Sequence, residues 1–148
     1  MRLKREKLKL EAPTSFSRFL GYSNPKYELE WFHKLIADHC QMLLEGKIKN
    51  LMVFMPPQHG KSEIISRNFP AWALGLNPDL KIVGCSYSSD LAQQFSRSIQ
   101  RTIDSKEYQA IFPETYLNGS NIRTDSRGYL RNVDLFCLLY TSPSPRDS

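Results

Sequence analysis

The sequence predicts an α/β domain in which helices flank a parallel sheet. Three observations lead to this prediction: two short apolar runs, helical stripes of apolar residues, and the alternation of the two kinds of segment along the chain. The runs Leu51–Met55 and Lys81–Tyr87 are typical of strands that are buried on both faces of a parallel sheet. The order helix, strand, helix, strand, helix is that of α/β proteins.

The helices are expected before, between and after these two strands. Apolar residues spaced by three and four predict a helix over 28–44, which Gly46 ends as a C-cap residue. A second helix is expected over 61–68, where Pro70 either breaks it or restarts it. Ser88 or Ser89 is expected to cap a third helix, whose stripe recurs every fourth residue from 91 to 103. A short helix over 105–112 precedes Pro113.

The two ends of the chain are predicted to lie outside this domain. Residues 1–13 carry five basic side chains and are expected to form a flexible basic arm. The domain itself is expected over 14–136, with a turn at Asn118-Gly119 followed by extended chain. The tail from Cys137 reads like a translated transposase sequencing adapter, so 137–148 is interpreted as an artefact and the domain as incomplete.

Composition is that of one ordinary globular domain. The 148 residues are 41% hydrophobic and 24% charged, and no segment is apolar over the length of a signal peptide or a membrane span. Cys40 and Cys85 lack metal-like spacing and are expected to be buried thiols in a reducing compartment. The net charge of +5 permits a polyanionic partner without requiring one.

One motif points to chemistry. The run Met55-Pro-Pro-Gln-His-Gly-Lys-Ser62 follows an apolar strand and opens a helix, as a phosphate-binding P-loop does. Backbone amides of such a loop surround phosphate oxygens, and the helix directs its positive end at them. Lys61 is expected to reach the outer phosphates, and Ser62 to ligate the accompanying Mg²⁺.

The motif departs from the usual pattern at its start. Met55 stands where the first glycine is usual, and Pro56 and Pro57 have no N–H to donate. The phosphate cradle is therefore expected from the amides between Gln58 and Ser62. An alternative is that Gly60-Lys61-Ser62 is an ordinary turn and helix start.

The order of several segments resembles the ATPase domain of phage terminase large subunits. These segments are Pro56–Glu63, Phe69–Trp72, Asn77–Leu80, Ser86–Ser88, Asp90–Ala92 and Phe112–Glu114, with Trp31-Phe32-His33 upstream. The resemblance implies a P-loop NTPase fold of the RecA-like (ASCE) class and an ATP- and Mg²⁺-dependent motor that drives DNA into the prohead. It further implies double-stranded DNA, the portal and the small terminase subunit as partners. It also implies a homo-oligomer on the portal and a soluble protein in the host cytoplasm.

Several family features are not matched in the sequence. Gln58 stands where many relatives carry an arginine, and the best candidate for the family's acidic strand end, Val133-Asp134, follows no apolar run. The family's nuclease domain is not present. The fragment is therefore expected to bind ATP weakly and not to hydrolyse it at a useful rate.

The remaining candidate residues each have a structural alternative. His59 is expected to donate to phosphate or to face solvent, and Glu63 to orient the loop or to favour the helix start. Tyr27, Trp31 and His33 are candidates for the adenine border, or core residues. Further candidates for contacts with nucleotide or DNA are Ser86, Tyr87, Ser88, Arg123, Arg127 and Arg131.

Two other functions remain open at this point. One is a different P-loop ATPase of helicase or recombination type, and the other is a nucleotide-binding module without catalysis. The continuation of the reading frame beyond Phe136 distinguishes them.

Overall fold

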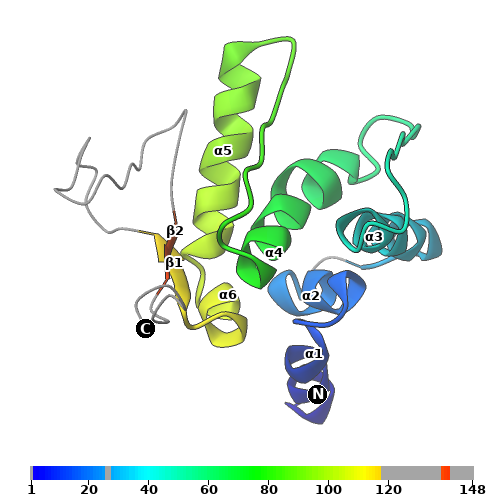
Figure 1. The fold of residues 1–148 in the computed structure, drawn as a ribbon. Coiled ribbons are helices and arrows are strands. Elements are labelled where there is room, and N and C mark those ends of the chain that lie inside the picture. Colours follow the sequence, from blue (N-terminus) through cyan, green and yellow to red (C-terminus); the bar gives the residue numbers. More distant parts are fainter. Residues whose placement is uncertain (1, 26–27, 118–137, 141–148) are drawn as a thin grey trace, which may run out of the picture.

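A computed structural model describes residues 2–25, 28–117 and 138–140 of the chain. Most of the described chain is helical (Figure 1). In order, the elements are α1 (Arg2–Glu11), α2 (Phe16–Ser23), α3 (Trp31–Leu44), the π-helical turn η1 (Glu63–Asn68), α4 (Phe69–Leu76), α5 (Ser89–Ile103), α6 (Lys106–Ile111), β1 (Thr115–Leu117) and β2 (Leu138–Tyr140).

Aromatic side chains from helices far apart in the sequence form the core. Phe16 and Phe19 of α2 pack against Trp72 of α4 and Tyr108 of α6, with ring centroids 5.2 Å apart for Phe16–Trp72 and 6.2 Å for Phe19–Tyr108. Burial of such rings is the main apolar contribution to stability in a small helical domain. Tyr108 donates its hydroxyl to the carbonyl of Ala71 at 3.0 Å, and burial raises the pKa of its phenol.

The end of α3 confirms the predicted C-cap. Gly46 has φ of 73°, a left-handed conformation that favours glycine. Its N–H donates to the carbonyl of Leu43 at 3.1 Å, and the N–H of Lys47 donates to that of Met42 at 2.9 Å. These two bonds form a Schellman motif, which satisfies carbonyls that the end of a helix leaves unpaired.

The basic N-terminal segment, expected as a flexible arm, forms helix α1. The link between α1 and α2 is held to α4, because the indole N–H of Trp72 donates to the carbonyl of Ala12 at 2.9 Å. Ala12 is fully buried. Arg5 lies 3.4 Å from the carboxylate of Glu107 and over the ring of Tyr22. The side chains of α1 thus find partners in α2 and α6.

The predicted parallel sheet is not present among the described residues. The segments 51–56 and 81–86 have no β pairing, although both were expected to be buried strands. Phe54 is 86% exposed and Val83 85% exposed. A strand buried in a sheet needs hydrogen-bonding neighbours at its edges and helices over its faces. Among the described residues neither segment has a pairing neighbour, and segment 51–55 is only partly covered: Leu51 packs against the core, whereas Phe54 is exposed.

The described strands instead form one short antiparallel pair. Thr115 faces Tyr140, and Leu117 faces Leu138, in the register of β1 and β2. β2 lies within the segment that the sequence predicted to be adapter-derived. The predicted turn at Asn118-Gly119 and the extended segment after it lie outside the described residues.

The two described cysteines differ in environment. Cys40 is buried in α3 as predicted, and burial raises the pKa of its thiol to about 11. Cys85 is exposed, so its prediction as a buried thiol is wrong. The segment 81–87, which contains Cys85, was expected to be buried in a sheet but lies at the surface.

Candidate functional site

The candidate phosphate loop, residues 55–62, joins an extended segment to a helix, as the motif predicts. Gln58 has φ of 64° and Gly60 φ of 80°, so two residues out of three adopt left-handed conformations. Such a backbone is costly for a residue with a Cβ and persists only where surrounding contacts hold it. The loop therefore has a defined backbone conformation, which both a phosphate loop and a tight turn can adopt.

The helix that follows the loop begins at Lys61. The N–H of Ile64 donates to the carbonyl of Gly60 at 3.0 Å, which is the first bond of this helix. The N–H groups of Lys61, Ser62 and Glu63 precede that bond and have no intrahelical acceptor. Amides in this position are suited to bind an anion.

Lys61 and Ser62 are not committed to other contacts in the described part of the chain. Lys61 is half-buried and forms no ion pair with another described residue. Ser62 is exposed, and its side chain makes no capping hydrogen bond. The alternative that Ser62 is simply a helix cap is therefore not supported by its geometry.

Glu63 belongs to the helix and not to the loop. Its carboxylate accepts from Arg67 at 2.6 Å and from the Asn68 amide at 3.2 Å, and its carbonyl also accepts from Asn68 at 2.8 Å. These bonds span the π-helical turn. Of the two roles considered for Glu63, the structure favours stabilisation of the helix start.

His59 uses its side chain within the loop. Its Nδ1 lies 2.8 Å from the carbonyl oxygen of Pro57. Because a carbonyl only accepts, Nδ1 carries the proton of this bond, and the neutral ring then has a bare Nε2. In that form His59 cannot donate to a phosphate.

His33 contacts the loop from helix α3. The ring is 5% exposed, and its Nε2 lies 3.0 Å from the carbonyl oxygen of His59. Its Nδ1 accepts from the backbone N–H of Glu30 at 3.1 Å. The structure therefore brings together two residues, 26 positions apart, that the sequence treated as separate candidates.

Aromatic rings extend from His33 to the protein surface. Phe32 packs on His33 with centroids 4.2 Å apart and lies 6.3 Å from the ring of His59. Trp31 meets Phe32 edge-on at 5.7 Å and is 73% exposed. Trp31 is thus a surface ring and not a core residue, while Tyr27 lies outside the described residues.

The other candidate residues lie on the segment before α5 or outside the described chain. Tyr87 is 95% exposed, and the backbone of Ser88 starts helix α5 without a side-chain cap. Ser86 lies in the same exposed segment. Arg123, Arg127, Arg131 and Asp134 lie outside the described residues.

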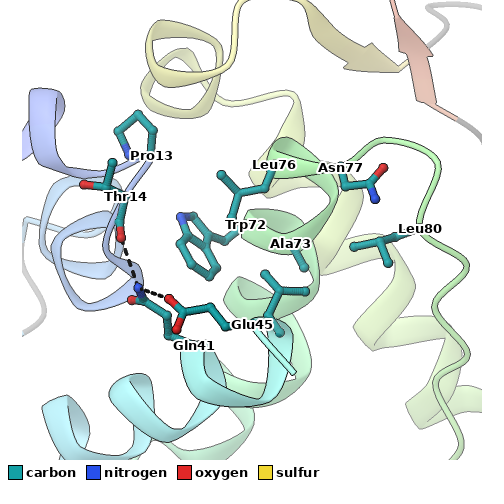
Figure 2. A pocket seen from close by; sticks show the side chains of 10 residues that line it. Pro13, Thr14, Gln41, Glu45, Trp72, Ala73, Leu76, Asn77 and Leu80 are labelled. Carbon is teal, nitrogen blue, oxygen red and sulfur yellow. Dashed lines mark hydrogen bonds between the residues drawn. The ribbon is translucent and has the colours of Figure 1, made fainter. Parts of the chain in front are cut away.

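Two cavities are lined by other parts of the molecule. One, of about 320 Å³, lies where the ends of α3 and α4 meet the link between α1 and α2, and Figure 2 shows Trp72 facing it. Gln41 bridges its wall by donating to the Thr14 carbonyl at 3.1 Å and to Glu45 at 2.8 Å (Figure 2). The bonds from Lys47 and Gln41 lower the pKa of Glu45.

The second cavity, of about 1050 Å³, lies beside α1. Basic residues among those that line it are Lys4, Arg5, Lys9, Arg18 and Lys34.

Neither of these two cavities includes a residue of the phosphate loop. The loop is nevertheless the stronger candidate site, because backbone amides bind phosphate at a loop without an enclosed pocket. Among the described residues, no group of three or more His, Cys, Asp or Glu side chains is arranged to hold a metal ion. No described helix is long and apolar enough to cross a membrane.

Comparison with known families gave one match. The family model described as "Terminase large subunit, T4likevirus-type, N-terminal" matches residues 52–133, which is more than half of the chain. This region contains the phosphate loop, η1, α4, α5 and α6. Searches of curated proteins and of solved structures each found no significant match.

Proposed function

Because the chain belongs to the family of the N-terminal region of T4-like terminase large subunits, we propose that its phosphate loop binds Mg²⁺-ATP for a motor that packages phage DNA. The family has a role in phage DNA packaging. The proposal concerns what this chain contributes to packaging, which is the binding of Mg²⁺-ATP. The observation that carries it is the loop conformation, with positive φ at Gln58 and Gly60, followed by Lys61, which forms no ion pair with a described residue.

The donors around the loop fit a nucleotide phosphate in number and kind. The amides at the helix start have no intrahelical partner, and Lys61 forms no ion pair with a described residue. Lys61 would hold the outer phosphates, and the Ser62 hydroxyl would be a ligand of Mg²⁺. When bound, Mg²⁺ neutralises charge on the phosphate oxygens. The exposed ring of Trp31, which packs edge-on against Phe32, would border the adenine.

Hydrolysis requires carboxylates that hold Mg²⁺ and orient water. The proposal for the described residues is nucleotide binding, because Lys61 and Ser62 are suited to phosphate and to Mg²⁺. ATP hydrolysis, DNA translocation and contacts with the portal and small subunit are proposed for terminase large subunits as a family. Hydrolysis is not proposed for the described residues, because in the sequence no acidic pair follows an apolar strand.

The proposal predicts that Lys61→Ala weakens Mg²⁺-ATP binding by about tenfold or more, since a charge-assisted hydrogen bond to phosphate is lost. Calorimetric titration of the 148-residue chain measures the dissociation constant. Lys81→Ala is the matched control, because Lys81 is exposed on the segment before α5 and the change in net charge is the same. No ATP binding by the unmodified chain, or equal binding by Lys61→Ala, would refute the proposal.

A further inference from the structure

His33 does not have the geometry of a residue that only borders a base. Its ring is buried, and both of its nitrogens are hydrogen-bonded to backbone groups on different parts of the chain. The carbonyl of His59 can only accept, so Nε2 donates to it. The N–H of Glu30 can only donate, so Nδ1 accepts from it. The neutral Nε2–H tautomer satisfies both bonds.

The two bonds join the start of α3 to the phosphate loop. Glu30 is the N-cap of α3, and its side chain accepts from the backbone of His33 while His33 accepts from the backbone of Glu30. This reciprocal capping box fixes the ring relative to the helix. The ring then presents its Nε2–H to the loop at a fixed position.

The bond to His59 reaches the loop where its backbone is strained. His59 lies between Gln58 and Gly60, the two residues of the loop with positive φ. The side-chain bond from His59 to Pro57 forms within the loop itself. The bond from His33 is a contact from another element, and strained loops keep their shape through such contacts.

We propose that His33 is a positioning residue for the phosphate loop, which its Nε2–H holds in the binding conformation through the carbonyl of His59. This inference rests on the proposed nucleotide binding. It assigns to His33 a role in shaping the loop, in place of direct contact with the adenine. A loop that is already in the bound conformation avoids the entropic cost of ordering it on binding.

Two substitutions separate the bond to the loop from the bond to the helix cap. His33→Asn places an amide oxygen near the position of Nδ1, so it keeps an acceptor for Glu30 and loses the donor to His59. His33→Gln reaches the position of Nε2, so it keeps a donor to His59 and loses the acceptor. The inference predicts that His33→Asn binds Mg²⁺-ATP about three- to tenfold more weakly, as expected for loss of one hydrogen bond. It predicts that His33→Gln binds within about twofold of the unmodified chain, at a lower melting temperature because the cap is weakened.

A second measurement tests the inference without nucleotide. Backbone ¹⁵N relaxation of Gln58 to Ser62 reports the order of the loop on the picosecond to nanosecond timescale. Order parameters should fall in His33→Asn and be kept in His33→Gln. If the unmodified chain binds no ATP, the proposed function fails while this readout still decides the role of His33. Unchanged affinity and unchanged loop order in His33→Asn, or equal losses in both variants, would overturn the inference.

Discussion

Single residues in this protein are constrained by what their side chains would meet. Gly75 lies in α4, where a Cβ would come within 2.5 Å of the Phe112 ring, which is itself buried. Gly21 lies in α2, where a Cβ would meet only Leu29 at 3.6 Å and Leu8 at 3.9 Å. Both glycines are helical, yet only Gly75 is required by packing.

Substitution of these two glycines by alanine should have opposite effects. Alanine favours a helix over glycine by up to about 1 kcal/mol. In Gly21→Ala that gain is kept, so the free energy of unfolding should rise. In Gly75→Ala, overpacking against Phe112 costs about 1–3 kcal/mol and should outweigh the gain. Urea unfolding monitored by circular dichroism measures both, and a stabilised Gly75→Ala would contradict the packing argument.

At the scale of elements, the helix after the phosphate loop contains a widened turn. η1 precedes Pro70, whose ring removes the N–H that an uninterrupted α-helix would use. The N–H of Phe69 instead donates to the carbonyl of Ile64, five residues earlier. The sequence left open whether Pro70 breaks or restarts the helix. In the structure the helix continues through a π-turn, which is a feature often found beside functional sites.

Asn68 should contribute more to this turn than the Glu63–Arg67 ion pair does. Asn68 is 5% exposed and donates to both the carbonyl and the carboxylate of Glu63. Asn68→Asp removes the donor and should cost about 1–3 kcal/mol of unfolding free energy. Arg67→Gln should cost less than about 1 kcal/mol, since the ion pair is partly exposed. Thermal unfolding of the two variants compares them, and the reverse order would show that the ion pair dominates.

At the scale of the whole molecule, long-range hydrogen bonds join the N-terminal part of the chain to helices α3 and α4. Gln41 accepts from the N–H of Phe16 at 3.2 Å and donates to Thr14, so α3 is joined to the start of α2. Trp72 joins α4 to the same region through Ala12, sixty residues away. These bonds tie together segments that are far apart in the sequence.

The two tryptophans should therefore respond differently to replacement by phenylalanine. Trp72→Phe removes the bond to the Ala12 carbonyl and leaves a cavity, so the free energy of unfolding should fall by about 2–4 kcal/mol. Trp31→Phe alters a ring that is 73% exposed, so it should change the free energy of unfolding by less than about 0.5 kcal/mol. Chemical denaturation followed by circular dichroism measures both. Equal effects would mean that the buried indole does not anchor the N-terminal helices.

The sequence by itself determined the local features of this protein. The end of α3 at Gly46, the start of α6 at Ser105 and the helix after Gly60 follow from residues adjacent in the chain, because capping and backbone preferences act over a few positions. The order of motifs similarly identified the terminase family. That the loop binds phosphate remains a proposal, which the Lys61→Ala variant tests.

Only the tertiary structure decided how distant segments meet. Apolar content alone predicted buried strands at 51–55 and 81–87, but pairing depends on partners that the described chain does not place beside them. The bond from His33 to His59 was likewise not predictable, because neither residue type nor spacing indicates a hydrogen bond across 26 positions. Short-range conformational preferences depend on neighbouring residues, whereas strand pairing and long-range hydrogen bonds depend on how the whole chain packs.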